Sequence, residues 1–143
     1  MMERAASEAQ VRVFIRDESD VVVARRRARE LASRQGLSEA EVEALATAVT
    51  EIARNIVVHA GGGEILFGRA VDGPRRGVVV IARDTGPGIP DVEQAMQDGF
   101  STKRGLGFGL PGARRLVDKF EIESKAGAGT TVTLRKWAAA KSQ

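Results

Sequence analysis

The sequence predicts an α+β fold, a two-layer α/β sandwich in which about three helices cover one face of a mainly antiparallel sheet. Five segments rich in β-branched and apolar residues are predicted as strands, and three segments with helical apolar spacing as helices. Their order is β-α-α-β-β-α-β-β, and consecutive strands are expected to pair as hairpins, which makes the sheet antiparallel. The alternating βαβ order of a doubly wound sheet is therefore not expected.

The first half of the chain is predicted to form one strand and two helices. The strand is the β-branched and aromatic run at residues 11–15. The first helix should begin at the capping residues 17–19 and run to about residue 35, since Gly36 suits the left-handed position that ends helices. The second should begin at the capping box Ser-Glu-Ala-Glu at 38–41 and run to about residue 60, before three consecutive glycines.

The second half is predicted to contribute four strands and the third helix. Residues 64–71 and 77–82 are expected to pair across a turn rich in Gly, Pro and Asp. A helix is expected over 110–119. Residues 120–124 and 130–137 should then form a closing hairpin across a glycine-containing turn.

The length of 143 residues fits a single domain, which we place at residues 10–138. Residues 1–9 are expected to be a disordered N-terminus and 139–143 a loose C-terminal end. The first residues lack the apolar core of a signal peptide, and no apolar run approaches the ~20 residues that span a bilayer. We therefore expect a cytoplasmic protein with no membrane partner.

Composition excludes several kinds of chemistry. The chain has no cysteine, so disulfides and thiolate metal sites are excluded. The single histidine, His59, cannot hold zinc alone and is expected to lie favourably at a helix C-terminus.

The charge balance gives little support for a nucleic-acid partner. The net charge is only +3, and one Trp, five Phe and no Tyr offer few stacking platforms. The one dense basic run is Arg25, Arg26, Arg27 and Arg29 on the first helix. We interpret it as a solvated helix face or as a docking face for an acidic protein partner.

Glu51 and Asn55 lie about 40° apart on the second predicted helix, on a face away from its main apolar positions. A carboxylate is suited to general-base catalysis, and an amide oxygen is a ligand for Mg²⁺. The helix spacing would hold both groups at a fixed separation. A plain solvated face of an amphipathic helix is the alternative interpretation.

Two glycine clusters follow further along the chain. Asp84-Thr-Gly86-Pro-Gly88 comes directly after a continuous apolar strand, and Gly-Leu-Gly-Phe-Gly at 105–109 opens a helix. A carboxylate at a strand end can accept a hydrogen bond from an adenine amino group, and a helix N-terminus can bind phosphate. The polar segment 91–104 between them is predicted to be a mobile lid, whose Lys103 and Arg104 can neutralise phosphate charge.

The second cluster also contains a G-x-G-x-x-G string at residues 107–112. A dinucleotide fingerprint needs a strand directly before the first glycine, and the preceding Ser-Thr-Lys-Arg is no strand. The chain also lacks a P-loop motif and the Val-Ala-Ile-Lys and His-Arg-Asp elements of protein kinases. The order of the motifs, rather than this string, therefore predicts a nucleotide site.

In this order the motifs resemble those of the GHKL ATPase/kinase superfamily, which has the Bergerat ATP-binding fold. Glu51-x-x-x-Asn55 resembles its N box, and the cluster that begins at Asp84 resembles its G1 box. Residues 105–110 resemble its G2 box, and Gly-Ala-Gly-Thr at 127–130 its last motif. The resemblance spans residues 11–137 and is greatest to the RsbT-like serine/threonine kinases and the anti-sigma regulatory kinases.

The resemblance implies ATP and Mg²⁺ as cofactors. Glu51 would be the catalytic base, Asn55 the metal ligand, and Asp84 the adenine contact, with Gly88 and Thr130 beside it. The implied ATP-binding residues are Asn55, Asp84, Gly86, Gly88, Ile89, Ser101, Thr102, Lys103, Gly105, Leu106, Gly107, Phe108, Gly109, Leu110 and Thr130.

The resemblance also implies the type of partner. As a serine/threonine protein kinase, the chain would phosphorylate a STAS-domain protein in a bacterial stress or sigma-factor module that works by partner switching. As a binding module, it would hold a sigma factor or activate a regulatory phosphatase, with ATP mainly a structural ligand. The base predicted at Glu51 favours the kinase, because a pure binder needs no base beside its metal ligand.

Overall fold

The computed structural model describes residues 11–86, 96, 109–125 and 127–139. These residues form five strands and three helices. In chain order they are β1 (Val11–Ile15), α2 (Glu18–Arg34), α3 (Glu39–Ala60), β2 (Gly63–Asp72), β3 (Arg75–Asp84), α6 (Gly109–Arg115), β4 (Lys119–Lys125) and β5 (Gly129–Trp137).

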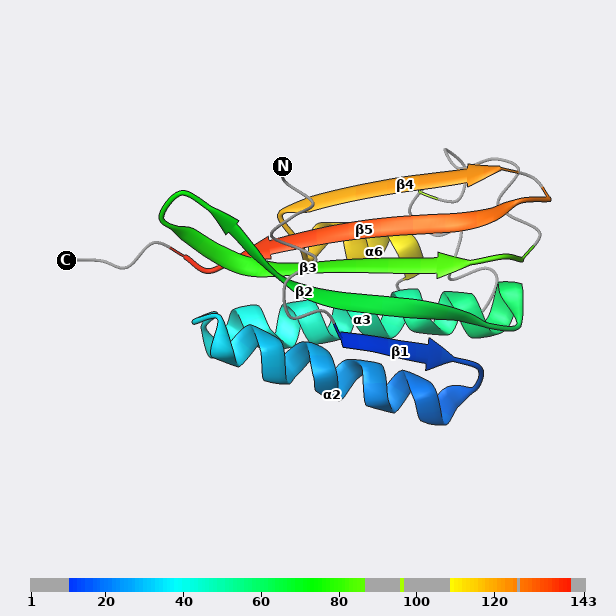
Figure 1. Ribbon diagram of the computed structural model, residues 1–143, viewed down its shortest axis with the longest axis horizontal. Helices are drawn as coiled ribbons and strands as arrows, with labels where there is room; N and C mark the ends of the chain where they lie inside the picture. The colour runs from blue at the N-terminus through cyan, green and yellow to red at the C-terminus, as the bar shows by residue number, and fades with distance from the viewer. Residues whose placement is uncertain (1–10, 87–95, 97–108, 126, 140–143) are drawn as a thin grey trace.

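The five strands form one sheet in the order β1-β2-β3-β5-β4, in which every pair of neighbours is antiparallel. Figure 1 shows β1 at one edge of this sheet and β4 at the other. Both predicted hairpins, β2–β3 and β4–β5, are confirmed, and β5 rather than β4 joins them by pairing with β3. Val132 and Leu134 of β5 are buried, whereas every second residue of β4 is an exposed charged residue, so β4 suits a sheet edge.

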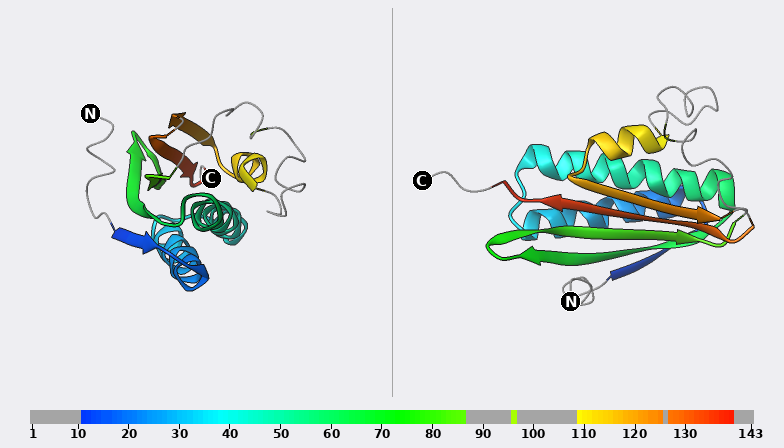
Figure 2. Two further views of the ribbon diagram at one scale, coloured as in Figure 1. Left: turned by 90° about the vertical axis from the view of Figure 1, so that its right-hand side faces the viewer. Right: turned by 90° about the horizontal axis from the view of Figure 1, so that it is seen from above.

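All three helices cover the same face of the sheet, as the left view of Figure 2 shows. The predicted two-layer α+β sandwich is therefore confirmed. The core lies between the layers and combines inward residues of α2 and α3 with those of the strands. Its largest fully buried side chains include Phe67, Ile15, Leu45, Ile52, Ile65 and Leu134.

The predicted helix boundaries at α2 and α3 are confirmed by their caps. Asp17 caps α2 by accepting from backbone N–H groups in its first turn, and Gly36 follows the helix with a φ of +87°. Ser38 and Glu41 form a reciprocal capping box on α3 over 3.1 and 2.7 Å. Gly61 then ends α3 in the left-handed conformation.

The third helix is shorter than predicted, because α6 ends at Arg115 and not at residue 119. The Asp118 N–H donates to the carbonyl of Arg135 over 3.0 Å, and the Asp118 carboxylate accepts from the Trp137 N–H over 2.7 Å. These bonds attach residue 118 to β5, so the chain leaves the helix to begin the β4–β5 hairpin. Separately, β2 and β3, at 63–72 and 75–84, are longer than the predicted strands at 64–71 and 77–82, and only a tight turn lies between them.

Within the described part of the chain, no helix is both long and apolar enough to cross a membrane. The expected N-terminal disorder at 1–9 falls outside the described residues, as do positions 140–143 of the expected loose C-terminal end. Ala139 is described, and its N–H donates to a carboxylate oxygen of Glu41 over 3.1 Å.

Candidate nucleotide-binding site

The central part of α3 carries Glu51 and Asn55, and the two side chains differ in exposure. Glu51 is buried at 8% relative exposure, Asn55 is half-buried, and Arg54 between them is exposed. Arg54 points to α2, where its Nε donates to a carboxylate oxygen of Glu18 over 3.2 Å. The interpretation of this face as a plain solvated one is therefore wrong for Glu51. Because a carboxylate is rarely buried without a partner, Glu51 is expected to have one.

The partner of Glu51 is the opening of α6. The backbone N–H of Gly109 donates to Glu51 Oε1 over 3.0 Å, and both groups are buried. The first N–H groups of a helix have no partner within the helix, so the carboxylate satisfies one of them. The structure thus joins the residue predicted as the base to the last glycine of the second glycine cluster.

Asp84 is the last residue of β3 and is half-buried. Its Oδ1 accepts a hydrogen bond from the Gly86 N–H over 2.9 Å, so the carboxylate folds the chain into a turn directly after the strand. In the sheet register Asp84 lies between Gly63 of β2 and Thr130 of β5.

Two glycines allow close backbone approaches around Asp84. A Cβ atom at Gly86 would lie 2.6 Å from the Cβ of Ala60, at the end of α3. Gly129 has a φ of +98°, and a Cβ atom there would overlap the Asp84 carbonyl oxygen. The segment after β3 lies directly against the end of α3 and the start of β5. Because these approaches leave no space for a Cβ atom, each of the two positions requires glycine.

Thr130 is buried opposite Asp84, and its Oγ1 lies 2.7 Å from Ser124 Oγ. The Ser124 hydroxyl also donates to the Gly129 carbonyl over 3.2 Å. Ser124 was predicted only as part of a strand. Its place across the predicted β4–β5 hairpin turn from Thr130 was the sequence signal that could have added it to the site.

The candidate site has two parts, which the second half of α3 connects. The middle of α3 holds the start of α6 through Glu51 and Gly109, whereas Ala60 at the end of α3 lies against Gly86, where the end of β3 pairs with the start of β5. Glu51 and Gly109 form one part, Asp84, Gly86 and Thr130 form the other, and Asn55 lies on α3 one turn beyond Glu51, between the two. Leu110 follows Gly109 in α6 and is buried. These residues thus supply a few precisely placed polar groups, as small-molecule binding sites do.

The remaining predicted site residues lie outside the described residues. They are Gly88, Ile89, Ser101, Thr102, Lys103, Gly105, Leu106, Gly107 and Phe108. The predicted lid at 91–104 also lies outside them, except for Met96.

The described residues contain no cluster of three or more His, Cys, Asp or Glu side chains that could hold a metal ion. Mg²⁺ that binds with a nucleotide takes most of its ligands from phosphates and water and needs only one or two from the protein. Asn55 fits that requirement, because it is half-buried and no described residue hydrogen-bonds its side chain. His59, which is exposed in the last turn of α3, is placed as predicted.

Two arginines of the basic run on α2 pair with side chains of α3. Arg25 donates to Thr50 Oγ1 over 3.2 Å and to Glu43 Oε1 over 3.3 Å, and Arg29 pairs with the other oxygen of Glu43. These bonds hold α2 against α3. Arg25 and Arg29 therefore do not form the free docking face that was one of the two interpretations of this run.

Known proteins are similar to this chain over most of its length. The family described as "Histidine kinase-like ATPase domain" matches residues 4–136. Serine/threonine-protein kinase RsbT of Bacillus subtilis (strain 168) is 45% identical over 125 residues, which make up 87% of this chain and 94% of RsbT. Anti-sigma F factor of Thermoanaerobacter sp. (strain X514) is 33% identical over 103 residues, or 68% of this chain and 71% of that protein.

A solved structure gives independent support for the fold. The crystal structure of the RsbU and RsbW domains of a Mycobacterium tuberculosis protein superposes with a TM-score of 0.61 at 22% identity. The match covers 92% of this chain and 34% of the other. Together with the match over residues 4–136, these similarities show that the chain belongs to the histidine kinase-like ATPase domain family, the GHKL superfamily.

Proposed function

We propose that this protein is an ATP-dependent serine/threonine protein kinase that phosphorylates a STAS-domain partner in a bacterial stress or sigma-factor module. The 45% identity to serine/threonine-protein kinase RsbT over most of both chains supports the activity. The observation that carries the proposal is the buried Glu51 carboxylate, held at Oε1 by the Gly109 N–H. A cytoplasmic location belongs to the same proposal, because ATP is supplied there.

Glu51 is suited to act as the base. One carboxylate oxygen is held by Gly109, whereas no described residue hydrogen-bonds the other, Oε2. Oε2 would accept the proton of a serine or threonine hydroxyl as the hydroxyl oxygen attacks the γ-phosphorus and the bond to the β-phosphate oxygen breaks. The bond to Gly109 keeps the carboxylate in one orientation, which positioned proton transfer requires.

The other residues would position the nucleotide. The outer oxygen of Asp84 would accept from the adenine amino group, with buried Thr130 beside it. Gly86, packed against Ala60, would hold the turn that orients Asp84, and Asn55 would hold Mg²⁺. When bound, Mg²⁺ supplies positive charge that neutralises the phosphates.

The similarity to anti-sigma F factor supports a second candidate function. At 33% identity over 68% of this chain, it is consistent with a module that holds a sigma factor or activates a phosphatase. In that case ATP would mainly stabilise the partner-binding form. The two functions differ in whether phosphate is transferred.

The test is transfer of γ-labelled phosphate from Mg-ATP to purified STAS-domain proteins that carry a serine or threonine acceptor. We expect transfer by the wild type and by Glu39→Ala, an exposed acid on the same helix, and none by Glu51→Ala. ATP affinity should be similar in all three proteins. Transfer that persists in Glu51→Ala would refute the assignment of the base, and binding of a sigma factor without transfer to any STAS protein would favour the second candidate.

A further inference from the structure

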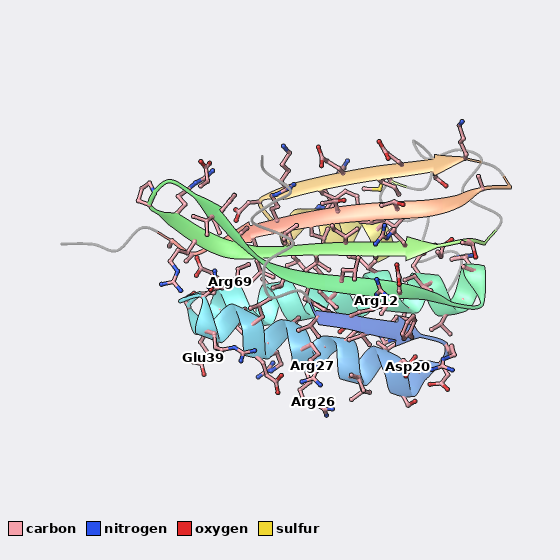
Figure 3. The ribbon with its side chains drawn as sticks, in the orientation of Figure 1. Arg12, Asp20, Arg26, Arg27, Glu39 and Arg69 are labelled. Atoms are coloured by element: carbon pink, nitrogen blue, oxygen red, sulfur yellow. The ribbon has the colours of Figure 1, made fainter. Side chains whose placement is uncertain are left out.

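A pocket of about 540 Å³ lies between α2 and the sheet, near the β2–β3 turn. Its rim carries four arginines, Arg27 and Arg34 from α2, Arg69 from β2 and Arg76 from β3. The apolar side chains of Val11, Leu31 and Phe67 also line it. Pockets of this size bind small molecules or peptide side chains. In Figure 3, Arg27 and Arg69 are labelled on α2 and β2, the elements that border the pocket.

Three of the residues that line the pocket lie along one face of α2. Arg27, Leu31 and Arg34 stand at i, i+4 and i+7, so they form one stripe on a single face of the helix. Seven residues of helix rise by about 10.5 Å, which separates the two arginines by far more than the width of one phosphate or carboxylate group. An extended peptide covers that length in about three residues.

Arg76 is held at the rim by a buried polar side chain. Gln35, at 3% relative exposure, donates from Nε2 to the Gly77 carbonyl over 3.0 Å. Its Oε1 accepts from Nη2 of Arg76 over 3.3 Å. A guanidinium that is already oriented loses less conformational freedom when it binds a carboxylate.

Two of the pocket's arginines, Arg34 and Arg76, form no ion pair with a described residue. None of its eight lining residues is Asp or Glu. Arg27 pairs with Glu30 outside the lining, over 3.2 Å. Arg25 and Arg29 on the neighbouring face of α2 likewise share the carboxylate of Glu43. A ligand that brings carboxylates to Arg34 and Arg76 would therefore be complementary to them in charge.

We propose that this pocket is a docking site for an acidic segment of a partner protein that carries an apolar side chain between its carboxylates. The carboxylates pair with Arg27, Arg34 and Arg76, and the apolar side chain packs on Val11, which is 37% exposed, and on the edge of Leu31. Both the length of the arginine stripe and the apolar lining favour such a segment over an isolated anion.

This site is separate from the nucleotide site and does not depend on phosphoryl transfer. Arg76 and Asp84 are eight residues apart on the same strand, which corresponds to roughly 27 Å. The docking segment would therefore bind at the opposite end of the sheet from the adenine site. Its binding can be measured without ATP and without any acceptor hydroxyl.

The experiment measures fluorescence anisotropy of a labelled peptide, Glu-Asp-Leu-Phe-Glu-Asp, with the full chain. Arg34→Glu is compared with Arg26→Glu, the same charge reversal at an exposed position of α2 that does not line the pocket. Figure 3 shows Arg26 on the side of α2 farther from the sheet. We expect saturable binding that weakens at least tenfold in Arg34→Glu and less than twofold in Arg26→Glu.

Two further comparisons test the apolar contact and a second arginine of the pocket. A peptide with serine in place of its leucine and phenylalanine should bind at least fivefold more weakly, and Arg76→Gln should reproduce the loss if Arg34→Glu fails to fold. Equal weakening by the two reversals, or equal binding of the two peptides, would overturn the proposal in favour of general charge attraction. Tighter binding of a single-stranded oligonucleotide of equal charge, or self-association of the chain that the peptide does not displace, would also overturn it.

Discussion

The backbone N–H of Gly109, the first residue of α6, donates to Oε1 of Glu51, a buried side chain in the middle of α3, over 3.0 Å. The two residues are 58 positions apart in the chain. The bond joins the acidic residue of one motif to the last glycine of another, so the carboxylate and the opening of α6 form one structural unit. Changes at either residue should therefore affect both the stability and the chemistry of the site.

Replacing Glu51 should separate its structural role from its chemical role. Glu51→Ala leaves the buried Gly109 N–H without an acceptor, and we expect it to lower the free energy of unfolding by about 1–3 kcal/mol. Glu51→Gln keeps an acceptor oxygen and should cost less than half as much, while still reducing phosphoryl transfer by about 10²–10⁴-fold. Urea unfolding and transfer assays measure the two effects. Equal stability of the two variants would contradict the role of the Gly109 bond.

Asp84→Asn should weaken adenine-nucleotide binding about tenfold or more, because a carboxylate acceptor facing the adenine amino group is replaced by a neutral amide. The amide oxygen can still accept from Gly86, so the turn after β3 should persist. Isothermal titration calorimetry with ATP measures the loss. Asp72→Asn, at the other end of the β2–β3 pair, is the control and should bind ATP like the wild type. Unchanged affinity in Asp84→Asn would count against the adenine assignment.

Gly86→Ala should displace the segment after β3 from the end of α3. Its Cβ atom would lie 2.6 Å from the Cβ of Ala60, closer than packed carbon atoms allow, so one of the two segments must shift. We expect a loss of stability of about 1–3 kcal/mol together with weaker ATP binding. Gly62→Ala is the matched control, because its nearest neighbour would be the Ile15 carbonyl oxygen at 3.5 Å. Similar losses in both variants would argue against a specific close approach at Gly86.

Asp17 should make a small pH-dependent contribution to stability. Its hydrogen bond from the Ser19 hydroxyl, followed by those from the backbone of the first turn, lowers its pKa below the ordinary value of 3.8. A carboxyl whose pKa is lower in the folded state stabilises the fold fully above pH 3.8, and that stabilisation disappears as the pH falls through the folded pKa.

Asp17→Asn keeps a good N-cap but removes this titration. Thermal unfolding of both proteins between pH 2 and 7 should therefore show a difference that shrinks as the medium becomes more acidic. A difference that stays constant over this range would rule out the Asp17 carboxylate as its source.

Local patterns predicted the helices and strands well, because the interactions that begin and end them join residues close in sequence. The capping box of Ser38 and Glu41 joins residues three apart, and Gly36 and Gly61 end helices through their own backbone conformation. The predicted helix at 110–119 was too long because its end is set by contacts with residues distant in the sequence. Asp118 is held by Arg135 and Trp137 of β5, which no pattern within the segment reveals.

The candidate site divides in the same way. By itself, the sequence determined the types of residue, their spacing and the elements that carry them: Glu51 and Asn55 on one helix, and glycines after a strand and before a helix. Only the tertiary structure decided that Glu51 is buried and held by Gly109, and that β5 brings Thr130 beside Asp84. It also decided that Arg25 and Arg29 form ion pairs with Glu43, whereas Arg34 and Arg76 line a pocket. Each of these outcomes depends on contacts between distant segments, whose geometry is set by how helices and strands pack and not by the residues of either segment alone.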